Sequence, residues 1–292
     1  MQQTKYLVIS PVRNEEKFIE NTIRSLISQT IRPQQWIIVN DGSTDRTRDI
    51  IEKYSSEHSW IKTIDRDDRG YAEPGGGVIR TFYTGYDQRD HDDFDFVVKL
   101  DGDLSFDPDY FEQLFQRFAK DPKLGMASGI CYIDRSGAHV AEKHPLTHVR
   151  GPSKVYRREC WQQIGGLVKH LGWDTIDEIK AQYYGWRTRS YPELRIIHHR
   201  ITGGNTGSLR WAIKLGQSDY YVGYHPLFVI VKYSRRIFIK PYLIGGLGAL
   251  YGYFRWFFSI QHHRYNEKKI IKYLQKEQIK CLMFRPSIYT RK

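Results

Sequence analysis

VKLDGDLSF, residues 98–106, is an apolar run that ends in two carboxylates one residue apart, Asp101 and Asp103. The apolar part predicts a buried strand. Side chains two residues apart on an extended chain point the same way, so both carboxylates would face one point beyond the strand end. Oxygen ligands there suit a hard cation such as Mg²⁺ or Mn²⁺, which takes further ligands from substrate phosphates. The alternative is structural, because Asp-Gly is also a common hairpin turn.

The chain around this stretch alternates short apolar runs with amphipathic segments. Strands are predicted at residues 6–10, 36–40, 61–64, 94–100, 125–130 and 194–199. Helices are predicted at residues 15–28, 44–54, 77–86, 108–118 and 266–284. This alternation predicts an α/β fold with a mainly parallel sheet flanked by helices.

Polar loops follow the three strongest of these strands, with SPVRNEE after the first, DGSTD after the second and DGD after residues 94–100. Ligands of open α/β sheets bind at the carboxyl ends of the strands, so we expect the three loops to share one crevice. Asp41 in the second loop is either a helix cap or an acceptor for ribose hydroxyls. No GxGxxG or P-loop motif follows a strand, which disfavours dinucleotide and P-loop binding.

The motifs ISPVRNEE, IIVNDGSTD and KLDGD, in this order and spacing, resemble the donor half of the family-2 glycosyltransferases with a GT-A fold. The resemblance extends over roughly residues 1–200. It implies transfer of a sugar from a nucleotide-diphosphate donor to a glycan or lipid-linked acceptor. It also implies inversion at the anomeric carbon and help from a divalent cation, Mn²⁺ or Mg²⁺.

Seven residues match the family's donor-binding positions, and they are Pro11, Asn14, Glu15, Asp41, Gly75, Arg80 and Asp101. The resemblance implies that the first three line the nucleotide pocket and that Asp41 holds the base or ribose. Asp101 would lie close to the ribose. Gly75 and Arg80 would lie where the donor-side helix begins, and a helix N-terminus suits a diphosphate. A plain loop-to-helix junction is an equal alternative for these two.

The resemblance makes Asp103 the direct ligand of the cation, with a histidine at the end of LRIIHH completing the site. Neutral imidazole is a reasonable ligand for Mn²⁺. His198 and His199 are both available, but adjacent residues on a strand face opposite ways, so only one can serve. The sequence leaves the choice between them open.

An inverting transfer needs a general base for the acceptor hydroxyl, and the resemblance places Asp174 at that position. Trp173 stands where the family usually has a glutamate, which is a departure. The choice between Asp174 and its neighbours Asp177 and Glu178 therefore stays open. Carboxylates at a helix start could also serve only as caps and dipole partners.

The composition, 40% apolar and 14% aromatic, is that of a folded globular protein. Three cysteines far apart in the sequence fit neither a disulfide framework nor a zinc cluster, and they indicate a reducing compartment. The first residues lead directly into a short alternating apolar segment, so no signal peptide is expected.

The net charge of +12 is confined to the end of the chain, because residues 232–292 contain 14 Lys plus Arg and 2 Asp plus Glu. We therefore expect a catalytic domain at residues 1–231, with a donor half at 1–104 and an acceptor half at 105–231, and a helical C-terminal region at 232–292. Residues 241–254 are apolar but too short to span a bilayer. Their aromatic and basic flanks predict contact of residues 235–264 with an anionic membrane surface. A helical hairpin packed on the catalytic domain or at a dimer interface is the alternative, and no fold motif supports nucleic-acid binding.

The sequence thus predicts a metal-dependent, inverting glycosyltransferase that is peripheral or monotopic at the cytoplasmic face of the cell membrane. It would act in the synthesis of a cell-surface polysaccharide or glycoconjugate. Two other classes stay open, a sugar nucleotidyltransferase and a non-catalytic sugar-binding or scaffold protein. The first of these would require a Gly-rich first loop with a basic residue for a triphosphate, whereas the first loop here is SPVRNEE.

Overall fold

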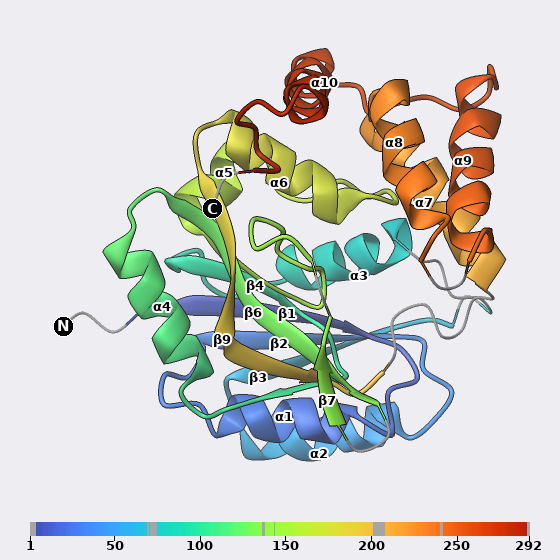
Figure 1. The fold of residues 1–292 in the computed structure, drawn as a ribbon. Coiled ribbons are helices and arrows are strands. Elements are labelled where there is room, and N and C mark those ends of the chain that lie inside the picture. Colours follow the sequence, from blue (N-terminus) through green and yellow to red (C-terminus); the bar gives the residue numbers. More distant parts are fainter. Residues whose placement is uncertain are drawn as a thin grey trace. The chain divides into compact units, whose positions relative to one another are not determined.

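A computed structural model describes residues 4–68, 70, 75–135, 138–142, 144–200, 208–239 and 242–290. The chain divides into two compact units, Met1–Arg200 and Ile201–Lys292. The first unit is built around a nine-stranded sheet with the order β3-β2-β1-β4-β8-β6-β9-β5, and β7 pairs with β6 (Figure 1). The strands are β1 (Tyr6–Val12), β2 (Gln35–Asp41), β3 (Ile61–Arg66), β4 (Phe96–Leu100), β5 (Leu104–Phe106), β6 (Leu124–Arg135), β7 (Ala138–Ala141), β8 (Ser153–Arg157) and β9 (Arg187–His198).

The first four strands in this order run parallel, and β1, β2 and β4 are almost wholly buried. Six helices accompany the sheet: α1 (Ile19–Ile27), α2 (Thr47–Glu57), α3 (Gly76–Tyr86), α4 (Tyr110–Lys120), α5 (Arg158–Ile164) and α6 (Trp173–Tyr183). One apolar core lies between the sheet and α1, α2 and α4, and a second lies between the sheet and α3, α5 and α6 (Figure 1). Burial on both faces explains why these strands read as continuous apolar runs.

Beyond β4 the sheet becomes mixed. β8 runs antiparallel to β4 and to β6, β9 is parallel to β6, and β5 is antiparallel to β9. The stretch Asp101-Gly102-Asp103 connects β4 to β5, but these two strands do not pair with each other. The hairpin alternative for this turn is therefore wrong, and the α/β sheet flanked by helices is confirmed.

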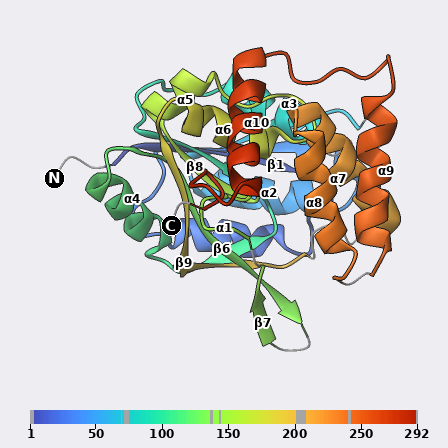
Figure 2. The ribbon, with the colours of Figure 1, turned by 45° about the horizontal axis from the view of Figure 1, so that its top comes forward.

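The second unit contains α7 (Ser208–Val222), α8 (Pro226–Arg236), α9 (Ile244–Phe257) and α10 (Lys268–Leu282). Figure 2 shows α7, α8 and α9 side by side. Helices α7 and α9 approach through glycines, since a Cβ on Gly216 would collide with the Ala249 carbonyl oxygen and one on Gly252 with that of Ile213. Within the described part of the chain, no helix combines the length and apolar character needed to cross a membrane.

The division at residues 200 and 201 differs from the boundary predicted at 231 and 232, which falls inside α8. Helix α7 carries little net charge, so composition groups it with the first domain. Its packing against α9 places it in the second unit. Helices α9 and α10 lie within residues 232–292, and the assignment of a separate C-terminal region to those residues stays a prediction.

Candidate active site

The loops after β1 and β2 are joined by hydrogen bonds around Asn14. Its backbone N–H donates to Ser43 Oγ (3.0 Å), and its Oδ1 accepts from the backbone N–H of Thr44 (2.8 Å). Asn14 has a φ of 54°, a left-handed conformation that Asn adopts more readily than most residues. Pro11 lies within β1, opposite Val39 of β2. The two predicted nucleotide loops therefore form one edge of the sheet.

Asp41 ends β2 at this edge, where it is buried. Its Oδ1 pairs with Arg66 Nη1 at 2.9 Å, and its carbonyl oxygen accepts from Arg13 Nη1 at 2.5 Å. Two guanidinium groups thus hold the end of β2 in place. A carboxylate so fixed is a suitable acceptor for the hydroxyls or base of a nucleoside.

Asp101 and Asp103 have different neighbours. The Asp101 carboxylate pairs with Lys99 Nζ, and its backbone N–H donates to the Pro152 carbonyl oxygen (2.8 Å). Burial raises the pKa of Asp101, with Lys99 acting in the opposite direction. Asp103 is the more deeply buried of the two, but His198 and Arg200 outweigh burial and leave the pKa of Asp103 below its ordinary value. Asp103 is therefore the more readily ionised carboxylate of the pair.

The structure separates the two histidines. His198, 6% exposed, ends β9 opposite Leu104 and places Nε2 3.5 Å from Asp103 Oδ2. The His199 ring turns away, with Nε2 2.8 Å from Ser105 Oγ and its face stacked on Phe18. Of the two, His198 is the one that reaches Asp103.

Arg200 bridges Asp103 and Glu15. Its Nη2 lies 2.5 Å from Glu15 Oε2, and its Nε lies 3.7 Å from Asp103 Oδ2. Burial and the nearby Asp103 raise the pKa of Glu15 to about 8, although Arg200 acts in the opposite direction. The Arg200 side chain is 37% exposed.

The group fits a divalent cation. Asp103 Oδ1 is buried and has no hydrogen-bond partner among the described residues, and an imidazole nitrogen lies beside the other oxygen. A carboxylate and a neutral imidazole are ligands that Mn²⁺ accepts. Asp103 and His198 are the residues that would hold it.

Helix α6 carries the three candidate bases. Asp177 is fully buried and accepts from Lys154 Nζ (2.9 and 3.0 Å) and from the Tyr156 hydroxyl (2.6 Å). Glu178 is buried too and accepts from the backbone N–H of Val149 (2.7 Å). Asp174 is only half-buried, and its Oδ2 lies 3.9 Å from the place that a Cβ on Gly151 would take. The geometry favours Asp174 as the carboxylate that an acceptor can reach.

Lys99 connects the Asp-Gly-Asp turn with the backbone of Gly151, which lies near Asp174. Its Nζ pairs with Asp101 and donates to the carbonyl oxygen of Gly151 (2.8 Å), the residue beside Asp174. Sequence reasoning missed this lysine. The signal was present, because Lys99 stands two residues before Asp101 and therefore on the same face of the strand.

Gly75 and Arg80 belong to the start of α3. Gly75 is the residue before the helix, with a φ of 75°, and a Cβ there would crowd Leu171. The contact with Leu171 is enough to explain why residue 75 is a glycine, with no need for a bound ligand. A diphosphate role for these two residues stays a prediction.

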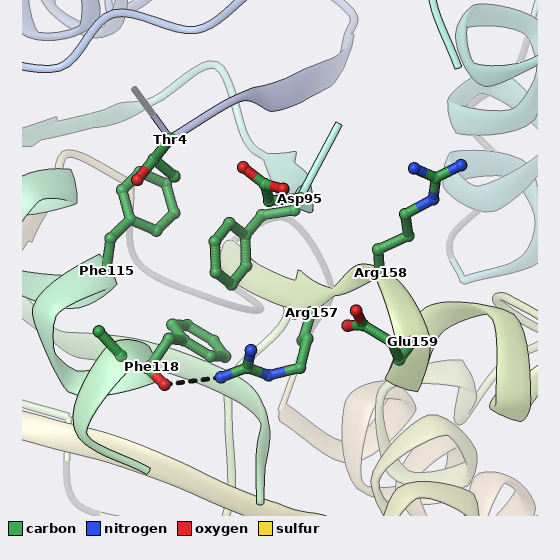
Figure 3. Close-up of a pocket in the computed structure, with 9 residues that line it drawn as sticks. Thr4, Asp95, Phe115, Phe118, Arg157, Arg158 and Glu159 are labelled. Atoms are coloured by element: carbon green, nitrogen blue, oxygen red, sulfur yellow. Dashed lines mark hydrogen bonds between the residues drawn. The ribbon is translucent and has the colours of Figure 1, made fainter. Parts of the chain in front are cut away.

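A hollow of about 320 Å³ lies elsewhere in the first unit (Figure 3). Its lining includes Thr4, Asp95, Phe118 and Arg157. Thr4 and Asp95 precede β1 and β4, so the hollow lies at the amino ends of these strands. Asp41 and Asp103 lie at the other edge, and the hollow is separate from the site described above.

The mixed sheet with carboxylates at the ends of its parallel strands is the architecture of a GT-A glycosyltransferase. The model of the family described as "Glycosyl transferase family 2" matches residues 7–172. Because this match takes in more than half of the chain, the protein belongs to that family. The predicted resemblance is confirmed.

Two relatives illustrate the likeness. The chain is 27% identical to the putative glycosyltransferase EpsH of Bacillus subtilis (strain 168) over 214 residues, 65% of this chain and 59% of that protein. It is 30% identical to a poly-beta-1,6-N-acetyl-D-glucosamine synthase of Staphylococcus aureus (strain COL) over 117 residues, 40% of this chain and 26% of that protein. The alignments thus span less than two thirds of the length of either relative.

A solved structure shares the fold. The mannosyltransferase from Pyrobaculum calidifontis in complex with GDP-Man and Mn²⁺ matches with a TM-score of 0.54 and 16% identity, over 85% of this chain and 69% of that one. At this identity the likeness concerns the fold alone.

Proposed function

We propose that the protein is a metal-dependent, inverting glycosyltransferase that moves a sugar from a nucleotide-diphosphate donor to a glycan or lipid-linked acceptor. The observation that carries the proposal is the placement of Asp103 and His198 beside each other at the edge of the sheet that also carries Asp41. Support comes further from family membership and from the mannosyltransferase neighbour, whose structure contains a nucleotide sugar and Mn²⁺.

In the proposed site, residues 1–104 hold the donor. Asp41, with Asn14 and Glu15 in the adjoining loop, receives the nucleoside, and Asp101 lies on its ribose side. Asp103 and His198 would hold the cation, which when bound supplies positive charge for the departing diphosphate. Arg200, released from Glu15 and Asp103, adds a second positive charge at the same edge.

Residues after 104 supply the acceptor side. Asp174 accepts the proton of the acceptor hydroxyl as that oxygen attacks the anomeric carbon from the face opposite the diphosphate. The attack forms the glycosidic bond while the bond to the diphosphate breaks, which inverts the configuration. Lys154 keeps the first turn of α6 in place, since its Nζ donates to the Asp174 carbonyl oxygen (2.7 Å).

The test is a panel of UDP-, GDP- and dTDP-sugars with Mn²⁺, scored by release of nucleoside diphosphate. Asp103→Ala should abolish release, and Asp174→Asn should abolish transfer while donor still binds. Asp87→Asn, at an exposed position after α3, is the matched control and should behave as wild type. Full transfer by Asp174→Asn would remove that residue as the base. A product with retained anomeric configuration would exclude inversion.

The same assay separates the other classes. A sugar nucleotidyltransferase would consume a nucleoside triphosphate and release pyrophosphate. A non-catalytic sugar-binding protein would release nothing from any donor. Transfer to a glycan acceptor is the outcome that only the proposed function produces.

We also infer that residues 235–264 hold the enzyme at an anionic membrane surface, on the cytoplasmic face, where a lipid-linked acceptor or growing polysaccharide is available. Most of the large apolar side chains exposed in the described residues belong to the second unit. Those between α8 and α9 and along the first two turns of α9 are Phe238, Ile239, Tyr242, Leu243, Ile244, Leu247 and Tyr251, which we call the outer α9 surface.

The positive charge of this region also supports an anionic membrane as the partner. Residues 220–266 contain no Asp or Glu, and Arg235 and Arg236 form the last turn of α8 beside the outer α9 surface. An apolar patch with basic neighbours fits the interface of an anionic bilayer. Basic residues near such a surface contribute on the order of 1 kcal/mol each.

Vesicle sedimentation tests this partner. The protein should bind vesicles that contain phosphatidylglycerol more strongly than vesicles of phosphatidylcholine alone. Phe238→Ser combined with Ile239→Ser should weaken binding to both, and Leu146→Ser, in the first unit, is the control. A dimer in solution that is lost in the Phe238 and Ile239 variant, without vesicle binding by wild type, would favour a second copy of the chain instead.

A further inference from the structure

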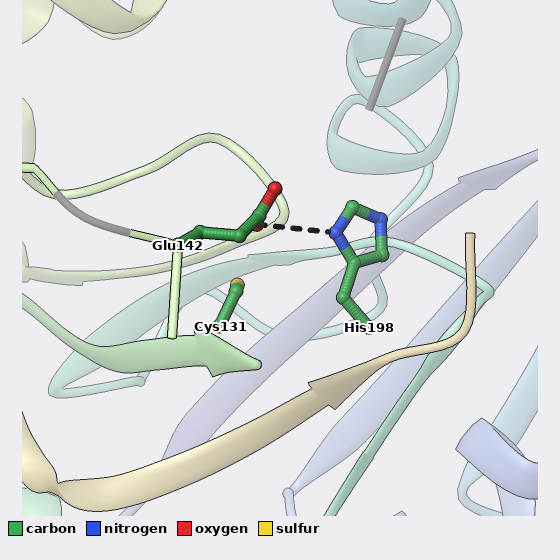
Figure 4. A group of neighbouring side chains, drawn as sticks. All are labelled: Cys131, Glu142 and His198. Atoms are coloured by element: carbon green, nitrogen blue, oxygen red, sulfur yellow. Dashed lines mark ion pairs between the residues drawn. The ribbon is translucent and has the colours of Figure 1, made fainter. Parts of the chain in front are cut away.

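Two side chains, Cys131 and Glu142, lie on the side of His198 that faces away from Asp103. The ligand atoms of Cys131, Glu142 and His198 lie within 4.8 Å of one another (Figure 4). Glu142 Oε2 is 3.5 Å from His198 Nδ1, and Nδ1 has no hydrogen-bond partner among the described residues. Two interpretations fit a carboxylate there: a metal site of its own, or a group that orients the His198 ring.

The charges around Glu142 argue against a separate metal site. The Arg150 guanidinium pairs with the Glu142 carboxylate, so a cation already lies against the carboxylate oxygen nearest the histidine. Cys131 is 2% exposed, and burial disfavours the thiolate that would bind a metal. A second metal ion would have to displace the arginine and ionise the buried thiol.

The same surroundings suit a role for the Glu142 carboxylate in orienting the His198 ring. Glu142 follows β7, and its backbone N–H donates to the carbonyl oxygen of Cys131 on β6 (2.8 Å). The Arg150 guanidinium holds the Glu142 carboxylate. Arg150 is itself held in place, because the next two residues, Gly151 and Pro152, accept hydrogen bonds from Lys99 Nζ and the Asp101 backbone N–H. Backbone and side chain of Glu142 are thus anchored to the elements that carry Asp101 and His198.

We propose that Glu142 is a positioning residue that accepts a hydrogen bond from the Nδ1–H of His198 and so leaves the Nε2 lone pair available for the cation held with Asp103. The inference rests on the proposed function, because it assumes that His198 binds this cation. Histidine ligands commonly donate their second ring N–H to a carboxylate, and removal of that partner costs about 10–100-fold in metal affinity.

The experiment measures Mn²⁺ affinity of the full chain by electron paramagnetic resonance of free Mn²⁺, without donor or acceptor. Glu142→Ala should weaken binding about 10–100-fold. Cys131→Ser, a change in the same cluster, should leave the affinity unchanged, and Asp103→Ala should abolish binding. Loss of affinity in the Cys131 variant as well would identify the cluster as a metal site and overturn the proposal. Wild-type affinity in Glu142→Ala would overturn it while the proposed function stands.

A second measurement does not depend on metal, and its deciding result comes from the wild-type protein. ¹⁵N spectra of the histidine side chains, with His198 assigned by its absence from His198→Gln, report which ring nitrogen carries the proton. Wild type should show His198 protonated at Nδ1, and Glu142→Ala should lose that preference. A wild-type ring protonated at Nε2 would overturn the proposal. Absence of any Mn²⁺ binding by wild type would instead contradict the metal dependence of the proposed function.

Discussion

Replacement of Lys154 by Met tests how the helix with the candidate base is held. Lys154 is fully buried, and its Nζ lies 2.9 Å from Asp177 Oδ2, 3.3 Å from Glu178 Oε1 and 2.7 Å from the Asp174 carbonyl oxygen. Removing it leaves two buried carboxylates without their common cation. Breaking a buried ion pair from one side costs about 3–5 kcal/mol. At about 2–4 °C per kcal/mol, the melting temperature should fall by about 6–20 °C.

The loss should depend on pH. Burial already raises the pKa of Asp177 to about 6, and Lys154 opposes this rise, so the variant should raise it further. A group whose pKa is higher in the folded protein stabilises it fully below the unfolded pKa, and this contribution is lost as pH rises through the folded pKa. The variant should therefore be closest to wild type at about pH 5 and furthest from it at about pH 8.

Thermal and urea unfolding of both proteins across this pH range are the measurements. Lys154→Met combined with Asp177→Asn removes the charge of the nearer carboxylate, retains the volume and should recover a large part of the loss, while Glu178 keeps its contact with His148. Lys120→Met, at an exposed position, is the control and should change stability by less than about 0.5 kcal/mol. A loss below about 1 kcal/mol that is the same at every pH would refute the reasoning.

Three further outcomes are expected. His198→Ala should weaken Mn²⁺ binding, whereas His199→Ala should not; the opposite order in a titration would show that the wrong histidine was chosen. Chelation by EDTA should stop transfer and Mn²⁺ should restore it, and activity that persists in EDTA would contradict metal dependence. Gly252→Val forces a side chain against the Ile213 carbonyl and should cost about 1–3 kcal/mol, seen as faster amide exchange in α7 and α9, while Gly245→Ala should leave exchange unchanged.

The parallel half of the sheet was predictable from the sequence because each strand and helix there carries its own local pattern. The apolar runs at residues 6–10 and 36–40 became β1 and β2, extended by two residues or fewer at either end. The antiparallel strands β5, β7 and β8 were missed. β5 and β7 are short, and β8 has the sequence SKVYR, whose lysine conceals a strand that is almost wholly buried.

The candidate site was predictable where a residue belongs to a motif at a strand end, as with Asp41 and Asp103. Residues that act through contacts distant in sequence were not. Glu142 reaches His198 across the β6–β7 hairpin, and the choice of His198 over His199 depended on the pairing of β9 with β5. The choice of Asp174 over Asp177 as the candidate base depended on the ion pair that Lys154 makes with Asp177. No local sequence pattern reveals that pair.

Helix α9 has one side packed against α7 through glycines and another side exposed. The two sides should respond differently to substitution. A Cβ on Gly252 would lie 2.1 Å from the Ile213 carbonyl oxygen, and one on Gly248 would lie 3.0 Å from the Ala212 Cβ, so few substitutions fit on this side of α9. Leu247 and Tyr251 on the outer side touch little and could become polar at almost no cost to folding. A saturation library of α9, scored once for abundance and once for vesicle retention, should therefore yield two sensitivity profiles of the same helical period with opposite phase. The offset between those profiles would measure directly how much of the apolar character of this helix is maintained for a partner outside the chain.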